Sequence, residues 1–310
     1  MPPGTVPCGT SGRHDDAMQW SPPQETDHQR MRMPLPRLTL PLACAALAAV
    51  STPTLAADDA ARPVVDVAPA DMHLDRLRPA TMTYLVYMHG AAGSGISRTM
   101  LATSEVKRER VDGVDAWTIE QHWEGETGMV HTARTVHAAA DIATLSQTST
   151  WIRPTGTYTT RVVPREGRGS VEGEVPEAAR AGMQAGFAAM KDGWWFNWHS
   201  DLVLLPLLPY EKGGTLRVHL FDVGMPAPID VDYTVVGERT LQGADGTGYD
   251  CWLVETESGR PGSGNYQRFW IDKARRVVVK EEDMYNGMYR SKVLLSVPAT
   301  VEFALPPKAA

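Results

Sequence analysis

The stretch Ala116-Trp-Thr-Ile-Glu-Gln-His-Trp123 decides the fold class of this chain. Large and apolar residues alternate with polar ones along it, with one set made of Trp117, Ile119, Gln121 and Trp123 and the other of Thr118, Glu120 and His122. A half-buried β-strand needs this alternation, because successive side chains of a strand point to opposite faces of the sheet. The stretch therefore predicts a strand with one face in a core and one face in solvent.

The same period of two continues on both sides of this stretch. It predicts further strands at 82–88, 98–107, 129–137, 142–152, 156–163, 215–221, 229–236, 249–256, 266–272, 276–282 and 288–295. Short connections, several marked by Gly, Asp or Asn, favour antiparallel hairpins over crossover helices. The expected fold is mainly β: a curved antiparallel sheet or incomplete β-barrel with one or a few covering helices.

One helix interrupts the strands, over residues 176–192. Pro176 and Glu177 suit its first turn, and Gly193 is a suitable C-terminal cap. Helical spacing places four residues on one apolar face: Ala179, Met183, Phe187 and Met190. Two glycines, Gly182 and Gly186, thin the helix so that another element can approach it closely.

Residues 31–56 have the pattern of a secretory signal peptide. Arg32 and Arg37 supply positive charge, 38–50 is apolar, and Thr54-Leu55-Ala56 offers a cleavage site near Ala56. The apolar run is shorter than the about 20 residues of a membrane span. Two rival interpretations are an uncleaved anchor and a lipoprotein signal ending at Cys44, but Pro41 disfavours the lipoprotein signal. The predicted location is the periplasm, with no transmembrane span in the mature chain.

The leader sets the expected domain organisation. Residues 1–30 are expected to be a non-native upstream extension, with Met31 or Met33 the true start. Residues 57–75 are expected to be a flexible tether, and 76–305 a single β-rich domain. Two of the three cysteines lie before residue 57, so Cys251 remains as a buried, inert thiol without a disulfide partner. A formal net charge of −7 argues against nucleic acid as a partner.

The motifs of catalysis and metal binding are weak. The glycine-rich stretch His89–Gly95 lacks the nucleophile elbow of a hydrolase and the Lys-Ser/Thr of a phosphate-binding loop. His131 and His137 are expected roughly 20 Å apart along one strand, too far to share a metal ion, and with His122 are interpreted as solvent-facing. The acidic run 281–283 is interpreted as cross-strand charge pairing on a wet face. We therefore predict no catalytic residue, no metal and no cofactor.

The most unusual mature segment is Trp194-Trp-Phe-Asn-Trp198 and the Leu/Pro-rich run that follows it. Aromatic surplus beside a helix with small residues can line an apolar cavity. The residues expected to bind a ligand are Met183, Phe187, Trp194, Trp195, Phe196 and Trp198. The alternative is that the same side chains only pack the core around the helix.

Three segments near the C-terminus carry a family resemblance. These are Tyr249–Thr256, Arg268–Glu282 and Tyr289–Leu295. They resemble the closing strands of a family of exported bacterial proteins of unknown function, which is similar in architecture to the lipoprotein-localisation carriers LolA and LolB. The resemblance, over about residues 80–296, implies a curved, incompletely closed barrel with a helix at its opening. In those carriers the concavity holds acyl chains, but no ligand-contacting residue of theirs matches a position here.

Three functions follow as hypotheses. The first is a periplasmic, non-catalytic binding or carrier protein for a lipid, lipoprotein or other apolar ligand. The alternative is an envelope structural or assembly factor that engages a protein partner through its sheet edges. A hydrolase is the least favoured, because the sequence offers no nucleophile–base pair.

Overall fold

The computed structural model describes residues 63–90, 96–191, 193–243, 246–257, 264–285 and 287–295. The chain divides into two units, 1–61 and 62–310, and every described residue belongs to the second. The predicted leader and upstream extension therefore lie outside the described residues, as does most of the glycine-rich stretch after His89.

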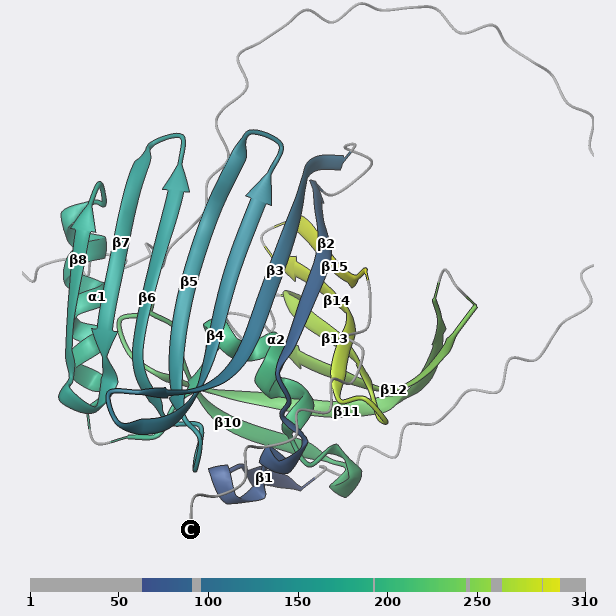
Figure 1. The fold of residues 1–310 in the computed structure, drawn as a ribbon. Coiled ribbons are helices and arrows are strands. Elements are labelled where there is room, and N and C mark those ends of the chain that lie inside the picture. The colour runs from purple at the N-terminus through teal and green to yellow at the C-terminus, as the bar shows by residue number, and fades with distance from the viewer. Residues whose placement is uncertain are drawn as a thin grey trace, which may run out of the picture. The chain divides into compact units, whose positions relative to one another are not determined.

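The described residues form one 15-stranded sheet in the order β1-β10-β11-β12-β13-β14-β15-β2-β3-β4-β5-β6-β7-β8, with β9 paired to β10 (Figure 1). The strands are β1 (Val64–Asp66), β2 (Ala80–Gly90), β3 (Ile96–Val111), β4 (Val114–Gly125), β5 (Gly128–Ala138), β6 (Thr144–Arg153), β7 (Gly156–Val163), β8 (Arg168–Gly173), β9 (Phe196–Asn197), β10 (Thr215–Phe221), β11 (Ile229–Gln242), β12 (Gly248–Glu257), β13 (Tyr266–Asp272), β14 (Val277–Tyr285) and β15 (Met288–Leu294). Apart from β1 and β9, which run parallel to β10, neighbouring strands are antiparallel. The predicted curved antiparallel sheet is confirmed, and in the described part its two end strands do not pair to close it.

The stretch at 116–123 lies within β4, as predicted. Trp117, Ile119, Gln121 and Trp123 are all buried, and His122 is exposed. Thr118 is buried as well, although it belongs to the other set, because Glu109 on β3 accepts a hydrogen bond from its hydroxyl and covers it. The alternation thus identifies the core face of this strand.

The sheet bends around a segment that fills its concave side. This segment runs through η4 (Trp198–Ser200), α2 (Asp201–Leu204) and η5 (Leu205–Leu207), and η6 (Tyr210–Lys212) follows it. In Figure 1, α2 lies between the long upright strands β2–β4 and the strands β10–β13 below them. Its leucines belong to the largest core cluster, together with inward-facing residues of the sheet: Leu202, Leu204, Leu205, Leu207 and Leu208. We call residues 197–208 the interior segment.

The predicted helix is α1 (Glu177–Ala189), which lies beside β8 (Figure 1). Met183, Phe187 and Met190 of the predicted apolar face are buried in a second core cluster. The helix ends at Ala189, with Met190 as its C-cap, which is earlier than the predicted end near residue 192. Arg180 donates hydrogen bonds to the carbonyl oxygens of Val171 and Gly173, so the helix covers this edge of the sheet.

The two helix glycines differ in their surroundings and give a matched pair of variants. A Cβ on Gly186 would collide with the carbonyl oxygen of Met225, whereas a Cβ on Gly182 would meet open space. We expect Gly186→Ala to destabilise the protein by about 1–3 kcal/mol through overpacking. Gly182→Ala is expected to stabilise it by up to about 1 kcal/mol, because alanine favours the helix. Urea unfolding of both variants checks this, and equal effects would contradict the close approach at Gly186.

The expected tether differs from the structure over residues 63–75. Val64–Asp66 form β1 on the edge of β10, followed by the turns η1 (Pro69–Asp71) and η2 (Leu74–Arg76). Three apolar side chains anchor them in the main core: Val67, Met72 and Leu77. The prediction of a tether over 57–75 rested on the polar composition of 57–62, and the apolar residues that pack at Val67, Met72 and Leu77 are spaced too irregularly to predict an element.

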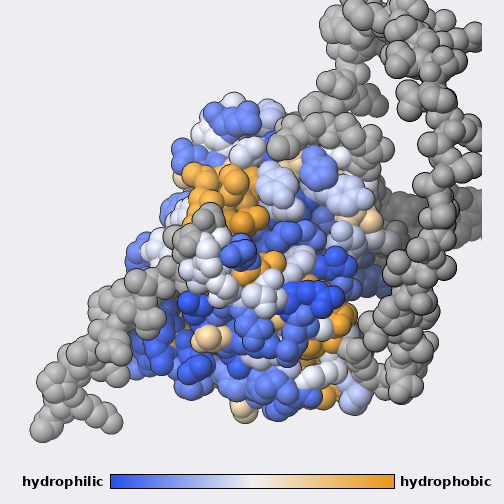
Figure 2. All heavy atoms as spheres, turned by 90° about the vertical axis from the view of Figure 1, so that its right-hand side faces the viewer, coloured by the Kyte–Doolittle hydropathy of each residue, from blue (hydrophilic) through white to orange (hydrophobic). Residues whose placement is uncertain are grey.

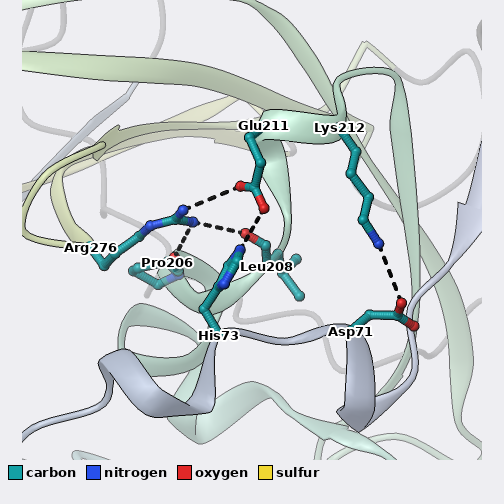
Figure 3. Close-up of polar contacts among 7 residues, drawn as sticks. All are labelled: Asp71, His73, Pro206, Leu208, Glu211, Lys212 and Arg276. Atoms are coloured by element: carbon teal, nitrogen blue, oxygen red, sulfur yellow. Dashed lines mark hydrogen bonds and ion pairs between the residues drawn. The ribbon is translucent and has the colours of Figure 1, made fainter.

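Polar contacts hold this N-terminal stretch onto the interior segment and η6 (Figure 3). Asp71 pairs with Lys212 at 3.4 Å, and His73 Nε2 lies 2.6 Å from Glu211 Oε1. The other oxygen of Glu211 pairs with Arg276 at 3.2 Å. The Arg276 guanidinium also donates to the carbonyl oxygen of Leu208 at 3.1 Å. Contacts from both the N-terminal stretch and Arg276 therefore hold the C-terminal end of the interior segment and η6 in place.

Candidate functional site

The six residues expected to bind a ligand divide between two core clusters. Met183 and Phe187 are buried in the second cluster, with Trp195 packed against it. Phe196 is fully buried in the main cluster, with Trp194 and Trp198 packed against its surface. The three tryptophans are half-buried, so they alone of the six keep part of their rings at the surface.

A small pocket lies between these two clusters. It is lined by residues from four parts of the chain, among them Thr144, Pro164, Met190, Trp194, Trp195 and Phe221. Its volume is about 10 Å³, on the order of one water molecule. The indole N–H of Trp194 donates to the carbonyl of Asp141 at 2.9 Å, and that of Trp195 to the carbonyl of Met190 at 3.0 Å. With their N–H groups paired, the rings have only apolar surface left to offer a ligand.

The interior segment begins with a run of polar residues that face polar partners on the sheet. The Asn197 amide donates to Gln147 Oε1 at 2.6 Å, and its oxygen accepts from the backbone N–H of His199 at 2.9 Å. Ser200 and Asp201, next along the chain, are also buried. Asn197 contacts β6, and His199 and Ser200 contact β5, so this run fixes the position of the segment against these two strands.

Ser200 and His137 form a nucleophile–base pair that the sequence did not reveal. His137 Nδ1 lies 2.9 Å from the carbonyl oxygen of Ile142, and Nε2 lies 2.8 Å from Ser200 Oγ. Because only an N–H can pair with the carbonyl, Nε2 accepts from the hydroxyl. Both residues are fully buried, and burial lowers the pKa of His137 to about 4. The pair anchors the interior segment; no described pocket exposes the hydroxyl to a substrate.

His131 is buried as well, so the interpretation of His131 and His137 as solvent-facing was wrong. The His131 ring stacks on Trp151 with centroids 3.9 Å apart and lies 5.2 Å from the ring of His199. Its Nδ1–H donates to the carbonyl of Thr150 at 3.0 Å, and burial lowers its pKa to about 2, with His199 adding to the effect. Alternation alone could not reveal that His131 is buried, because the pattern counts histidine as polar, whereas its ring here packs on Trp151. Within the described ranges, no three His, Cys, Asp or Glu side chains are grouped to hold a metal ion.

A buried charge cluster contains four buried residues, Asp201, Glu281, Asp283 and Lys292, together with Arg290, whose side chain is 12% exposed. Lys292 Nζ lies 2.7 Å from Glu281 Oε2, and Arg290 pairs with Asp283 and, at 3.6 Å, with Glu281. These are cross-strand pairs of β14 and β15. The pairing was predicted, but its place on a wet face was wrong: side-chain exposure is 1% for Glu281 and 2% for Asp283.

Only the middle residue of the acidic run faces outward. Glu282 is paired with Lys280 at 2.5 Å on the outer face. The signal that could have revealed the cluster is the matching alternation of Glu281 with Asp283 and of Arg290 with Lys292, which places like charges on one face of each strand. Nothing in that pattern says which face is buried.

Burial sets the protonation of the cluster. Burial and the neighbouring Asp283 together raise the pKa of Glu281 to about 8, against the opposing effect of Lys292. Burial also raises the pKa of Asp201. The pKa of Asp283 is lowered instead, because Arg290 and Lys292 outweigh the effect of its burial.

These shifts predict a stability maximum near pH 6.5. Below this pH, His131 and His137 take up protons only when the chain unfolds, so stability falls by up to about 1.4 kcal/mol per pH unit for each histidine. Glu281 acts in the opposite direction: its raised pKa gives stability that is present below its ordinary value and lost as the pH rises to about 8. Urea unfolding from pH 5 to pH 9 measures the curve. Replacing the exposed His122 by Gln should leave it unchanged, and a stability that only rises across this range would contradict the assignment.

The remaining surface offers few other sites. Cys251 is fully buried and free, as predicted, and burial raises the pKa of its thiol to about 12. A shallow groove of about 380 Å³ borders η6 and includes Tyr210, Trp252 and Lys273. Figure 2 shows a mostly hydrophilic face on which the apolar areas are separate. None of the described helices is long and apolar enough to cross a membrane.

A family model described as "Protein of unknown function (DUF3108)" matches residues 83–293. This match confirms the resemblance to a family of unknown function that the closing strands indicated. No curated protein is detectably similar to the chain.

Three solved structures are similar to the chain. A beta-barrel-like protein of the DUF1849 family from Brucella abortus is 12% identical, with 71% of this chain and 96% of that chain covered and a TM-score of 0.42. A DUF1329 family protein from Desulfovibrio piger is 13% identical, with coverage of 77% and 96% and a TM-score of 0.25. A domain described as an outer membrane lipoprotein-sorting protein, from Vibrio parahaemolyticus, is 12% identical, with coverage of 75% and 92% and a TM-score of 0.23. At these scores, none of the three carries an argument about function.

Proposed function

Because the chain belongs to the DUF3108 family of proteins of unknown function, we propose its function from its own geometry. The protein is a periplasmic, non-catalytic binding or carrier protein for a lipid, lipoprotein or other apolar ligand. The location rests on the signal peptide predicted at residues 31–56.

The observation that carries this proposal is the group of half-buried tryptophans between the two core clusters. Trp194 and Trp195 flank the small pocket, and their N–H groups are already paired with backbone carbonyls. Covering the exposed apolar surface of an indole ring is favourable by about 25 cal/mol for each Å² removed from water. An acyl chain or a similar apolar group is the ligand chemistry that recovers this energy.

Binding must enlarge the pocket, because about 10 Å³ is far below the roughly 300 Å³ of a ligand site. The pocket lies where the two core clusters meet, so it opens when they part. The Trp195 ring lies directly over Gly193, where a Cβ would collide with it, and its N–H is bonded to the carbonyl of Met190. Rotation of this ring, which breaks that hydrogen bond, is the movement proposed to admit a ligand.

Quenching of tryptophan fluorescence by dibromostearate tests the proposal. We expect saturable quenching by the bromine atoms, and we expect Trp194→Ala and Trp195→Ala each to weaken binding about tenfold, equivalent to about 1.4 kcal/mol of lost apolar contact. Leu101→Ala is the matched control, because Leu101 is an exposed apolar residue, 41% accessible, on β3. Absence of saturable quenching, or equal weakening in the control, would overturn the proposal.

One observation favours the alternative of an assembly factor. β10 pairs with β11 only as far as Thr234, and β11 continues to Gln242 alongside β12. In the described part, no strand covers the other edge of β11 beyond Val235. An extended peptide can add to such an edge. Cross-linking in cells from a photoreactive residue at Thr240 tests it: a discrete protein adduct supports this second function, and no adduct at this position removes it.

A further inference from the structure

The buried charge cluster contains more acids than bases. Three carboxylates, those of Asp201, Glu281 and Asp283, face two cations, Arg290 and Lys292. Full ionisation would leave one negative charge without a counter-charge inside the domain. A buried, unpaired charge is unfavourable enough that a group binds a proton instead.

The hydrogen bonds of the cluster point to the same proton. Glu281 Oε1 and Asp283 Oδ1 are buried and accept no hydrogen bond, whereas Glu281 Oε2 lies 2.7 Å from Lys292 Nζ. Glu281 and Asp283 lie two residues apart on the same face of β14, and Arg290 pairs with both. Two ionised carboxylates are both acceptors, so one of them can satisfy the other's free oxygen only when it carries a proton.

We propose that Glu281 and Asp283 share one proton at neutral pH, and that loss of this proton to solvent releases α2 from β14 and β15. This inference does not depend on the identity of any ligand. It assigns a conformational role to the cluster: the bound proton keeps the interior segment packed against β14 and β15.

The groups that face Glu281 come from every element packed around it. Asp283 lies on the same strand, Arg290 and Lys292 lie on β15, and Asp201 lies on α2. The phenols of Tyr84 on β2 and Tyr233 on β11 complete the surroundings, and burial raises the pKa of both, so they stay neutral in the working range. Glu281 is therefore the group whose charge changes near pH 8.

The strands and the helix respond differently to the added charge. β14 and β15 are held by a ladder of six residue pairs, and β13 and β2 flank them. α2 has only four residues, and its Asp201 carboxylate accepts from the backbone N–H of Leu202 at 2.6 Å rather than from the sheet. Ionised Glu281 repels Asp201, and the element with fewer bonds to the sheet is the one that moves.

Hydrogen exchange between pH 6.5 and pH 9, corrected for intrinsic rates, tests the proposal. In the wild-type protein we expect protection of residues 198–208 to fall about tenfold more than that of β5 as the pH rises through 8. Glu281→Gln imitates the protonated state and should hold 198–208 protected to pH 9. Glu282→Gln is the matched control, because Glu282 is the adjacent residue on the outer face, and it should behave like wild type.

Asp201→Asn provides a second variant in case Glu281→Gln does not fold. It removes the charge on α2 that Glu281 repels, so it too should keep 198–208 protected to pH 9. The proposal is overturned if wild-type protection of 198–208 does not change across this range. It is also overturned if whichever of Glu281→Gln and Asp201→Asn folds loses protection of 198–208 as much as the wild type does.

Discussion

Lys292→Met is expected to lower the free energy of unfolding by about 3–5 kcal/mol, the effect of breaking a buried ion pair. Lys292 has a side-chain exposure of 2%, and its Nζ lies 2.7 Å from Glu281 and 5.6 Å from the ring of Trp123. Methionine fills a similar volume but leaves the acids of the cluster with Arg290 as their single cation within it. Because the lost counter-charge cannot be replaced by water in the core, the effect exceeds that of a surface pair.

Lys280→Met is the matched control for this prediction. Lys280 lies on β14 with its side chain 27% exposed, paired with Glu282 and over the ring of Trp270. We expect it to cost about 1 kcal/mol or less. Thermal unfolding should show a fall in Tm for Lys292→Met of roughly 6–20 °C. Equal shifts for the two variants would show that the cluster is not buried as described.

Phe187→Ala is expected to cost about 3–5 kcal/mol. Phe187 is 1% exposed and belongs to the second core cluster, where its ring fills the space left by Gly169 on β8. Removing the ring leaves a cavity between α1 and the sheet that the rigid strands β7 and β8 cannot close. Gln184→Ala, on the exposed side of the same helix, should change stability by about 0.5 kcal/mol or less. Urea unfolding compares the two, and a small effect at Phe187 would mean that α1 does not seal the core.

This prediction also separates packing from binding. Met183 and Phe187 were proposed as ligand contacts together with the tryptophans, yet both are buried among core side chains. If ligand contact is confined to Trp194 and Trp195, a folded Phe187→Leu variant should bind dibromostearate as wild type does.

Alternation predicted most of the sheet because one face of most strands packs on the core. For 266–272 the predicted bounds agree with those of β13. The strand β8 was not predicted, because only Val171 of its six residues is buried and two of them are glycine. The helix was predicted by its apolar face, but its end came earlier because Met190 caps it.

The site was harder to predict because its key residues are polar. A pattern of period two identifies the residues that share a face, but it does not show that Glu281 and Asp283 face the core while Glu282 faces solvent. That depends on α2 lying over β14, a contact between residues about eighty positions apart in sequence. The pairing of Ser200 with His137 likewise joins a segment and a strand that no local pattern connects.

Native mass spectrometry of the protein isolated from its own cells tests the proposed function most directly. The account predicts a population with an added mass of a lipid or other apolar molecule, reduced in Trp194→Ala and Trp195→Ala and retained in Leu101→Ala. Recovery of unliganded protein alone, under conditions that preserve a control lipid carrier with its ligand, would contradict it.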